Sequence, residues 1–463
     1  MSRSTPTSAL ELSRLSTAEV LGLYQRKTLS PVDVTNALLT RIEALQPGFN
    51  AYRHVDREAA LAGARASEAR WLKRKPLGLL DGVPVSFKDL LHVQGWPTRK
   101  GSLATSSQCQ PEDSPVAARL RESGAVLVGK TQTAEYGWRG LTESSLAGIT
   151  RNAWNPDYAS GGSSGGAAVA AALGLGLQIG TDGGGSIRQP AAVNGVFGFK
   201  PSYGRVAGYP AALNGNLFHI GPITRNVSDA ALLLNVIAQP DIRDWTSLPR
   251  DIDDWSKGLD NPRLNLKGVR IAYSRSLFNI PVDPEIAALV ERAVTRLKEH
   301  GAQIEEIDPG IENPSAILNV LAAERGARLQ RELGEKGLEL VSTEIRAAVE
   351  QGRKVSVADV VGAQEQRAAL AVQWRRFHQR YDLLLTPVQS QPVPVVGTVP
   401  QAPFLSVFNL TQQPAASVPV GVDSRGLPVA LQIVGPPLGD LLVLRAARVY
   451  ELLQPFAITP HAV

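Results

Sequence analysis

The chain has 463 residues, a formal net charge of +5 and a hydrophobic fraction of 43%. This composition is typical of a globular protein and excludes a disordered chain. The charge excess is small and the only compact basic run, residues 73–75, is short, so nothing indicates a partner nucleic acid. The single cysteine, Cys109, excludes an internal disulfide and a cysteine-based zinc site.

The compartment is predicted from what the sequence lacks. Residues 1–20 have no apolar core of a signal peptide. Two stretches of the chain are uncharged. Residues 159–181 are interrupted by glycines and serines, and residues 383–422 by seven prolines, which argues against a membrane-spanning helix in either. We therefore expect a cytoplasmic protein that does not enter a membrane. The spacing of the six histidines predicts no metal site, and we expect no cofactor.

The first clear helix is expected to begin at Pro31. Ser30 can cap it, proline suits the first helical position, and Asp33 complements the helix dipole. The apolar residues that follow at helical spacing are Val34, Leu38, Ile42 and Leu45. A second helix is expected at 115–123, capped by Ser114 and stopped by Gly124, with a strand after it at 125–128.

Residues 269–307 predict a strand, a helix and a second strand in succession. The helix, at 284–300, has Asp283 as its cap and Gly301 as its end. Alternating strands and helices predict an α/β protein with a mixed or parallel sheet. Two other segments carry few motifs: 239–267 is polar and turn-rich, and 318–365 is charged and favours helix.

Three glycine-flanked stretches contain the candidate catalytic groups. In residues 81–89, Lys88 ends a short apolar run, where burial would lower its pKa and make it a base; the alternative is a surface lysine paired with Asp89. Residues 161–166 contain Ser163 before an alanine-rich helix. Residues 180–188 place three glycines before Ser186, so that several backbone N–H groups can point at one spot, as an oxyanion hole requires.

Other classes of site fit these stretches less well. Residues 161–165 match the G-x-S-x-G pattern of an α/β-hydrolase esterase with Ser163 as nucleophile, but no HGGG oxyanion motif precedes them. Neither glycine run ends in the Gly-Lys-Ser/Thr of a phosphate-binding loop. Neither gives the G-x-G-x-x-G of a dinucleotide site.

Taken together, several spaced segments resemble the amidase signature family. They are residues 80–89, 142–166, 180–192, 198–205 and 426–432. The resemblance implies an α/β fold in which helices cover both faces of a large mixed β-sheet. It also implies a single domain over 1–463, with a motif-bearing core at about 65–235 and 380–450 and a variable helical part at about 240–380.

The resemblance assigns roles by position. Ser186 is the nucleophile, Lys88 is the base, and Ser163 is the bridging serine, which follows a cis peptide bond from Gly162 in this family. The backbone of the glycine loop forms the oxyanion hole, at Gly183, Gly184, Gly185 and Ser186. Many members have threonine or isoleucine where this chain has Gly183, a departure that puts the contribution of this position in question.

The expected activity is hydrolysis of a carboxamide, or of a related carbamate or urea C–N bond, through an acyl-enzyme on Ser186. The partner is then a small molecule, and a homodimer is one possible assembly. Three alternatives remain open: the glutaminase subunit of a tRNA-dependent amidotransferase, an esterase using Ser163, and a scaffold protein without activity. Residues 310–380, Tyr136 and Trp138 are candidates for the substrate pocket, although both aromatics fit a core equally well. We expect Arg188 to pair with Asp182.

Overall fold

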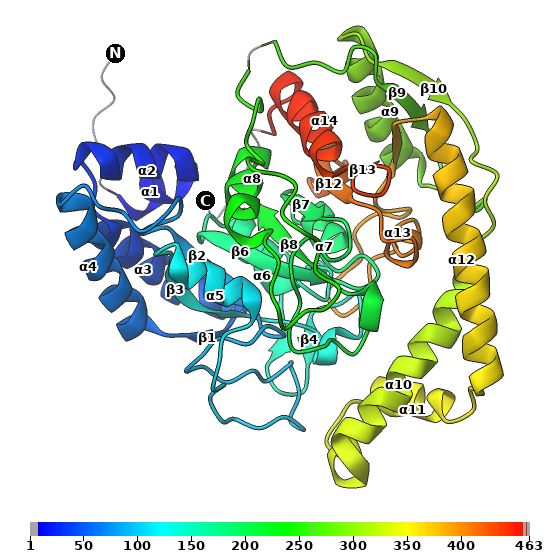
Figure 1. Cartoon of the computed structure of the whole chain (residues 1–463), viewed down its shortest axis with the longest axis horizontal. Coiled ribbons are helices and arrows are strands. Elements are labelled where there is room, and N and C mark those ends of the chain that lie inside the picture. Colours follow the sequence, from blue (N-terminus) through cyan, green and yellow to red (C-terminus); the bar gives the residue numbers. More distant parts are fainter. Residues whose placement is uncertain (1–7, 262, 457–459, 461–463) are drawn as a thin grey trace.

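The computed structural model describes residues 8–261, 263–456 and 460, which build one mixed β-sheet flanked by helices (Figure 1). The sheet strands are β1 (Tyr52–Val55), β2 (Pro84–Lys88), β3 (Val126–Thr131), β6 (Leu177–Asp182), β7 (Phe197–Lys200), β8 (His219–Thr224), β9 (Arg270–Tyr273), β10 (Gln303–Glu306), β11 (Leu383–Pro387), β12 (Ala415–Val422) and β13 (Pro428–Val434). They lie in the order β1-β3-β2-β6-β8-β7-β12-β13-β11-β9-β10. A separate hairpin consists of β4 (Glu143–Ser144) and β5 (Gly148–Ile149).

The α-helices precede, separate and follow these strands. They are α1 (Ala9–Arg14), α2 (Thr17–Arg26), α3 (Pro31–Phe49), α4 (Arg57–Leu72), α5 (Pro115–Glu122), α6 (Gly165–Ala172), α7 (Arg188–Val193), α8 (Val227–Ile237), α9 (Pro284–Glu299), α10 (Ser315–Leu338), α11 (Thr343–Gly352), α12 (Val357–Arg380), α13 (Val407–Leu410) and α14 (Asp440–Leu453). Two short 3₁₀ turns are η1 (Glu135–Gly137) and η2 (Gly215–Leu217).

The three predicted helices begin where expected, and the two predicted ends lie one residue beyond the observed ones. Two of the three predicted caps are confirmed. The Ser30 hydroxyl accepts a hydrogen bond from the N–H of Val32, and Asp283 caps α9 in the same way. Ser114 precedes α5 as expected, but its side chain does not cap that helix. Its hydroxyl donates instead to the carbonyl of His92 at 2.8 Å, so the side chain bonds to a distant part of the chain and not to the first turn of α5.

Alternate residues of the strands face helices on opposite sides of the sheet. In β11, Leu383 and Leu385 pack in a cluster with α5, α8, α9 and α14. Leu384, between them, packs with α10, α12 and α13. Both faces are therefore covered, as predicted, and the near-continuous apolar sequence of β11 follows from burial on both sides.

The sheet also includes strands from the part of the chain that was expected to vary. The predicted strand–helix–strand unit forms β9, α9 and β10, and the two strands are parallel. The polar segment 239–267 contains no helix or strand among its described residues. Residues 315–380 form α10, α11 and α12, of which α10 and α12 run down one side of the molecule in Figure 1. We call these three helices the helical arm.

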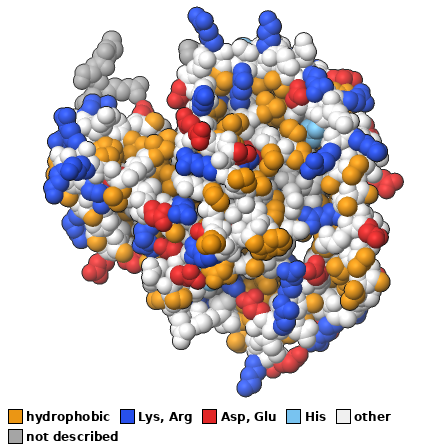
Figure 2. Space-filling view, viewed as in Figure 1, with side chains coloured by type: hydrophobic (Ala, Val, Ile, Leu, Met, Phe, Trp, Pro, Cys, Tyr) orange, Lys and Arg blue, Asp and Glu red, His pale blue; other side chains and the backbone are white. Residues whose placement is uncertain are grey.

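The surface of the described residues shows two general features. Basic and acidic side chains are interspersed over the face in Figure 2, which is hollowed between the central body and the helical arm. Within the described ranges, none of the helices combines the length and the apolarity that crossing a bilayer requires.

Candidate active site

Lys88 ends β2 and is completely buried. Its Nζ donates to Ser163 Oγ at 2.7 Å and to Thr181 Oγ1 at 2.9 Å. Because β2 runs parallel to β6, which contains Thr181, the carboxyl ends of both strands meet at this point of the sheet. The sheet thus brings together groups that lie 75 and 93 residues from the lysine along the chain.

The alternative role for Lys88, a surface lysine paired with Asp89, is wrong. Asp89 instead pairs with Lys130 of the neighbouring strand, at 3.1 Å. Burial holds the pKa of Lys88 well below its usual 10.5. The nearby charge of Asp182 opposes this shift and that of Arg325 adds to it. This shift favours the neutral amine, which has a lone pair for a proton.

Ser163 and Ser186 line one cavity of about 330 Å³, which we call the lysine-side cavity. The peptide bond from Gly162 to Ser163 is cis, as the family resemblance implies. Ser163 is 1% exposed and Ser186 is partly exposed. The N–H of Ser164 donates to the carbonyl of Ser186 at 3.3 Å, which ties the two serine loops together. The serine bonded to lysine lies deep, and the other lies nearer the opening.

The glycine loop before Ser186 presents free backbone donors. Within the described ranges, the N–H groups of Gly183, Gly184 and Ser186 have no acceptor. Gly185 differs from expectation: its N–H donates to the Asp182 carboxylate at 2.7 Å, so it is not free for an oxyanion. Its φ of 125° explains the glycine, since other residues rarely adopt that conformation.

The glycine at position 183 also has a local explanation. A side chain at this position would collide with the amide of Asn214. Asn214 lies just before η2 and lines the cavities on both sides of the glycine loop. The space that a larger side chain at position 183 would need is taken here by a polar amide.

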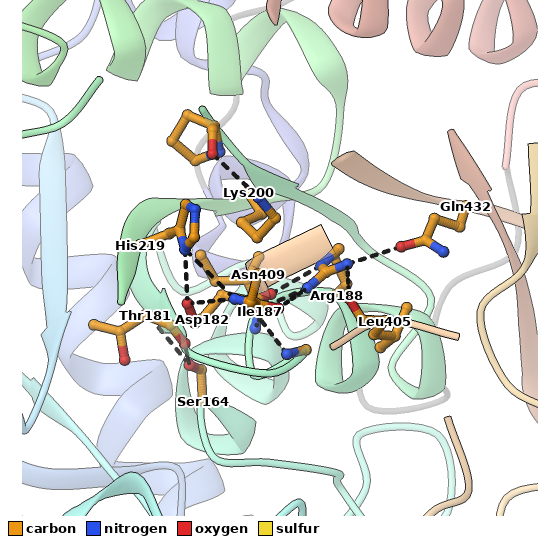
Figure 3. Close-up of polar contacts among 12 residues, drawn as sticks. Ser164, Thr181, Asp182, Ile187, Arg188, Lys200, His219, Leu405, Asn409 and Gln432 are labelled. Atoms are coloured by element: carbon orange, nitrogen blue, oxygen red, sulfur yellow. Dashed lines mark hydrogen bonds and ion pairs between the residues drawn. The ribbon is translucent and has the colours of Figure 1, made fainter. Parts of the chain in front are cut away.

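A buried polar network supports the loop from below (Figure 3). Asp182 accepts hydrogen bonds from the N–H groups of Gly185 and Ile187, at 2.7 and 3.2 Å. Arg188 approaches both carboxylate oxygens at 3.0 Å, which confirms the predicted ion pair. Burial alone would raise the pKa of Asp182, but the positive charge and hydrogen bonds of Arg188 hold it well below its usual value. The carboxylate is thus ionised and fixes the loop around Ser186.

Further buried groups complete this network. Arg188 donates to Gln432 and Asn409 at 2.8 and 2.7 Å, which links the loop to β13 and α13. His219 lies against the same cluster, and burial keeps its pKa well below 6.5, so the imidazole is neutral. Its Nδ1 lies 2.8 Å from the carbonyl of Leu217. All these side chains brace the loop, and none of them lines either cavity beside Ser186.

A second cavity, of about 180 Å³, meets the first at Ser186. We call it the glycine-loop cavity, because residues 183–185 form one wall. Tyr136 lines the lysine-side cavity and Trp138 the glycine-loop cavity, so both candidates do border the site. The Tyr136 ring also belongs to a hydrophobic cluster with α10 and α11, so it is a core aromatic as well.

Sequence reasoning missed three residues of the site. Thr181, the second partner of Lys88, lies inside a recognised motif and could have been proposed from its place at the end of an apolar strand. Asn214 and Arg325 lie outside every motif. Among the described residues, no cluster of His, Cys, Asp and Glu is arranged to hold a metal ion, and Cys109 is exposed.

A mixed α/β sheet that joins a buried lysine and two serines beneath a glycine loop is the arrangement that the sequence resemblance implies for a hydrolase of amide C–N bonds. The chain matches the Amidase family over residues 33–444. It therefore belongs to the amidase signature family.

Individual relatives extend the likeness over almost the whole chain. A glutamyl-tRNA(Gln) amidotransferase subunit of Geobacter metallireducens is 33% identical, over 96% of this chain and 98% of that protein. The same subunit of Moorella thermoacetica is 36% identical, over 96% and 97%. Among solved structures, a bacterial aryl acylamidase of the amidase signature family has a TM-score of 0.87 and 30% identity, over 95% of this chain and 96% of that one.

Proposed function

We propose that the chain hydrolyses a carboxamide through an acyl-enzyme on Ser186, with Ser163 and Lys88 as the proton relay. The observation that carries this proposal is the buried Lys88, whose Nζ lies 2.7 Å from Ser163 Oγ in a cavity that also contains Ser186. A buried, neutral amine hydrogen-bonded to a serine is the base that nucleophile activation needs when no histidine is available.

The reaction follows from the order of these groups. Lys88 takes the Ser163 proton while Ser163 takes the Ser186 proton, and Ser186 Oγ attacks the amide carbonyl carbon. The oxyanion accepts hydrogen bonds from the free N–H groups of Gly183, Gly184 and Ser186. As the C–N bond breaks, Ser163 gives its proton to the leaving amine and takes back the proton held by Lys88, which is then neutral again. Water attacks the Ser186 ester while the same relay removes its proton, and Ser186 regains its hydrogen from Ser163 as the acid product leaves.

Active-site labelling tests this proposal. A fluorophosphonate should modify Ser186, and mass spectrometry of the labelled peptide identifies the site. Ser186→Ala should abolish both labelling and amide hydrolysis, whereas Ser163→Ala should lower the hydrolysis rate by about 10²- to 10⁴-fold, because it removes the proton-transfer group. Labelling of Ser163 in the wild-type protein would instead support the esterase alternative. A folded protein that takes no label would support a scaffold role.

Glutamine hydrolysis is a second candidate, and the sequence relatives favour it. The relatives from Geobacter metallireducens and Moorella thermoacetica are both the A subunit of a glutamyl-tRNA(Gln) amidotransferase, and this chain matches nearly their full length. In this second function, the acyl-enzyme on Ser186 forms from the side-chain amide of glutamine, and a partner subunit receives the ammonia that is released. Rates of hydrolysis measured on glutamine, anilides, aliphatic amides, carbamates and ureas separate the candidates. Strict glutamine preference, with co-purification of a partner subunit, is the expected result for the second.

A further inference from the structure

Arg325 of α10 is a cation without a counter-ion. Its guanidinium lies 4.1 Å from the centroid of the Trp138 ring, and its Nη2 donates to the Tyr136 carbonyl at 2.6 Å. Its Nε is buried and has no hydrogen-bond partner. Within the described ranges, no carboxylate pairs with Arg325. Burial lowers its pKa to about 9, and no negative charge opposes that shift.

Two other cations near the site are paired with carboxylates. Arg328, one turn further along α10, pairs with Glu324 at 2.6 Å. Lys100, at the lysine-side cavity, pairs with Glu332 at 2.8 Å. The Arg325 side chain is partly exposed, with a buried Nε, and a charge removed from water in this way is costly without a partner. Unlike these two cations, Arg325 has no carboxylate partner among the described residues beside the glycine loop, which points to an anion that the chain itself does not supply.

Arg325 borders the reaction centre directly. It lines the glycine-loop cavity together with Ser186 and the loop itself. The described residues that line this cavity include two arginines, Arg139 and Arg325, and no aspartate or glutamate. Arg139 already lies 3.1 Å from Glu344. The positive charge left in the cavity is that of Arg325, and it is close enough to contribute to the lowered pKa of Lys88.

The two cavities divide the substrate at the scissile bond. The leaving amine must lie within reach of Ser163, which lines the lysine-side cavity but not the glycine-loop cavity. The acyl half then extends from Ser186 past the glycine loop towards Arg325. At about 180 Å³ the glycine-loop cavity suits a short chain.

We propose that Arg325 binds a carboxylate on the acyl half of the substrate, so that the preferred substrate is the monoamide of a short dicarboxylic acid or an amino acid of that form. This inference rests on the proposed function. The Trp138 ring and the Tyr136 carbonyl hold the guanidinium in place before substrate arrives, which lowers the entropy lost on binding. A planar guanidinium can hold both carboxylate oxygens at once, as a lysine ammonium cannot.

Matched amides test the inference. The kcat/KM of the wild-type protein should be at least about 30-fold higher for glutaramate than for pentanamide, which has the same acyl length but no carboxylate. Arg325→Met should lower this ratio by a similar factor, mainly through KM, and Arg325→Lys should recover only part of it. Arg331→Met is the matched control, because Arg331 is exposed on the same helix, and it should leave the ratio unchanged.

The outcomes separate this inference from the proposed function. A wild-type protein that hydrolyses both amides equally would overturn the role of Arg325 while leaving the Ser186 mechanism intact. An Arg325→Met variant that loses both activities by the same factor would show a structural role and overturn the inference too. If that variant does not fold, the wild-type ratio and competitive inhibition by glutarate against pentanoate decide the question. Hydrolysis that survives Ser186→Ala would overturn the proposed function itself.

Discussion

Each group at the reaction centre has its properties set by a few neighbours. Lys88 would be charged in water, yet the groups described within hydrogen-bonding distance of its Nζ are neutral, namely two hydroxyls and a carbonyl. The sequence predicted this lysine because it ends an apolar run in a recognisable motif. It could not predict Arg325, because the residues that contact its guanidinium lie almost 190 residues away in the chain. The lack of a carboxylate partner is also visible only in the structure, where the neighbouring Glu324 pairs with Arg328 instead.

The buried lysine makes activity depend on pH. The folded pKa of Lys88 is lowered well below 10.5, so activity should be full above that folded pKa and should fall as pH drops through it. Protonated Lys88 has no lone pair for the Ser163 proton. The pH profile of kcat/KM on an amide measures this effect. Should activity stay constant down to the pH at which the protein unfolds, a neutral-lysine base would be untenable.

Removing the same lysine should stabilise the fold. Below its folded pKa, Lys88 is protonated in both states and the full cost of burying the charge opposes folding. Between that pKa and 10.5 only the unfolded state binds the proton, so this cost declines as pH rises. Lys88→Met should thus raise the free energy of unfolding by about 1–3 kcal/mol near neutral pH and by less near pH 10. Urea unfolding at several pH values checks this; a Met variant less stable than wild type at neutral pH would contradict it.

At the scale of elements, the site is a meeting of strand ends and loops. β2 brings Lys88, β6 brings Thr181 and Asp182, and the loop before α6 brings Ser163. The order of these elements could be predicted, because each ends in a glycine-flanked motif. The hydrogen bond from the Gly185 N–H to Asp182 could not be predicted, because it depends on where the Asp182 carboxylate points after β6 ends.

The carboxylate under the loop gives a second stability prediction. Asp182→Asn leaves Arg188 as an unpaired buried cation and should cost about 3–5 kcal/mol in the free energy of unfolding. Amide hydrolysis should fall as well, because the loop loses its anchor. Denaturant unfolding measures the first effect. The double variant Asp182→Asn, Arg188→Met is the control: it should be less destabilised than the sum of the two single changes, and strict additivity would speak against a coupled pair.

At the scale of the whole molecule, the helical arm closes over one side of the site. The N–H of Ser342 donates to the Glu135 carboxylate at 2.9 Å, and Arg325 reaches Tyr136. Tyr136 also packs with apolar residues of the arm, among them Leu329. The sequence predicted helices in this part of the chain from their composition. It did not predict that these helices pack against the site. Their exposed charged residues do not indicate which surface they contact, and their apolar residues are widely spaced.

The docking of the arm should be mainly apolar. Leu329→Ala, at a fully buried position, should cost about 2–5 kcal/mol and should raise KM for the preferred amide, because the arm carries part of the pocket wall. Glu332→Gln, which removes a partly exposed ion pair with Lys100, should cost less than about 1 kcal/mol. Thermal unfolding and steady-state kinetics of both variants measure the contrast. Equal destabilisation by the two would mean that charge, rather than packing, holds the arm.

Bond cleavage and selection of the acyl group are therefore assigned to different parts of the chain. In the proposed mechanism, bond cleavage depends on Lys88, Ser163 and Ser186, which the sheet brings together. The candidate for selecting the acyl group, Arg325, comes instead from a single helix of the arm. Exchange of a few α10 side chains could redirect the protein to a different amide without disturbing proton transfer.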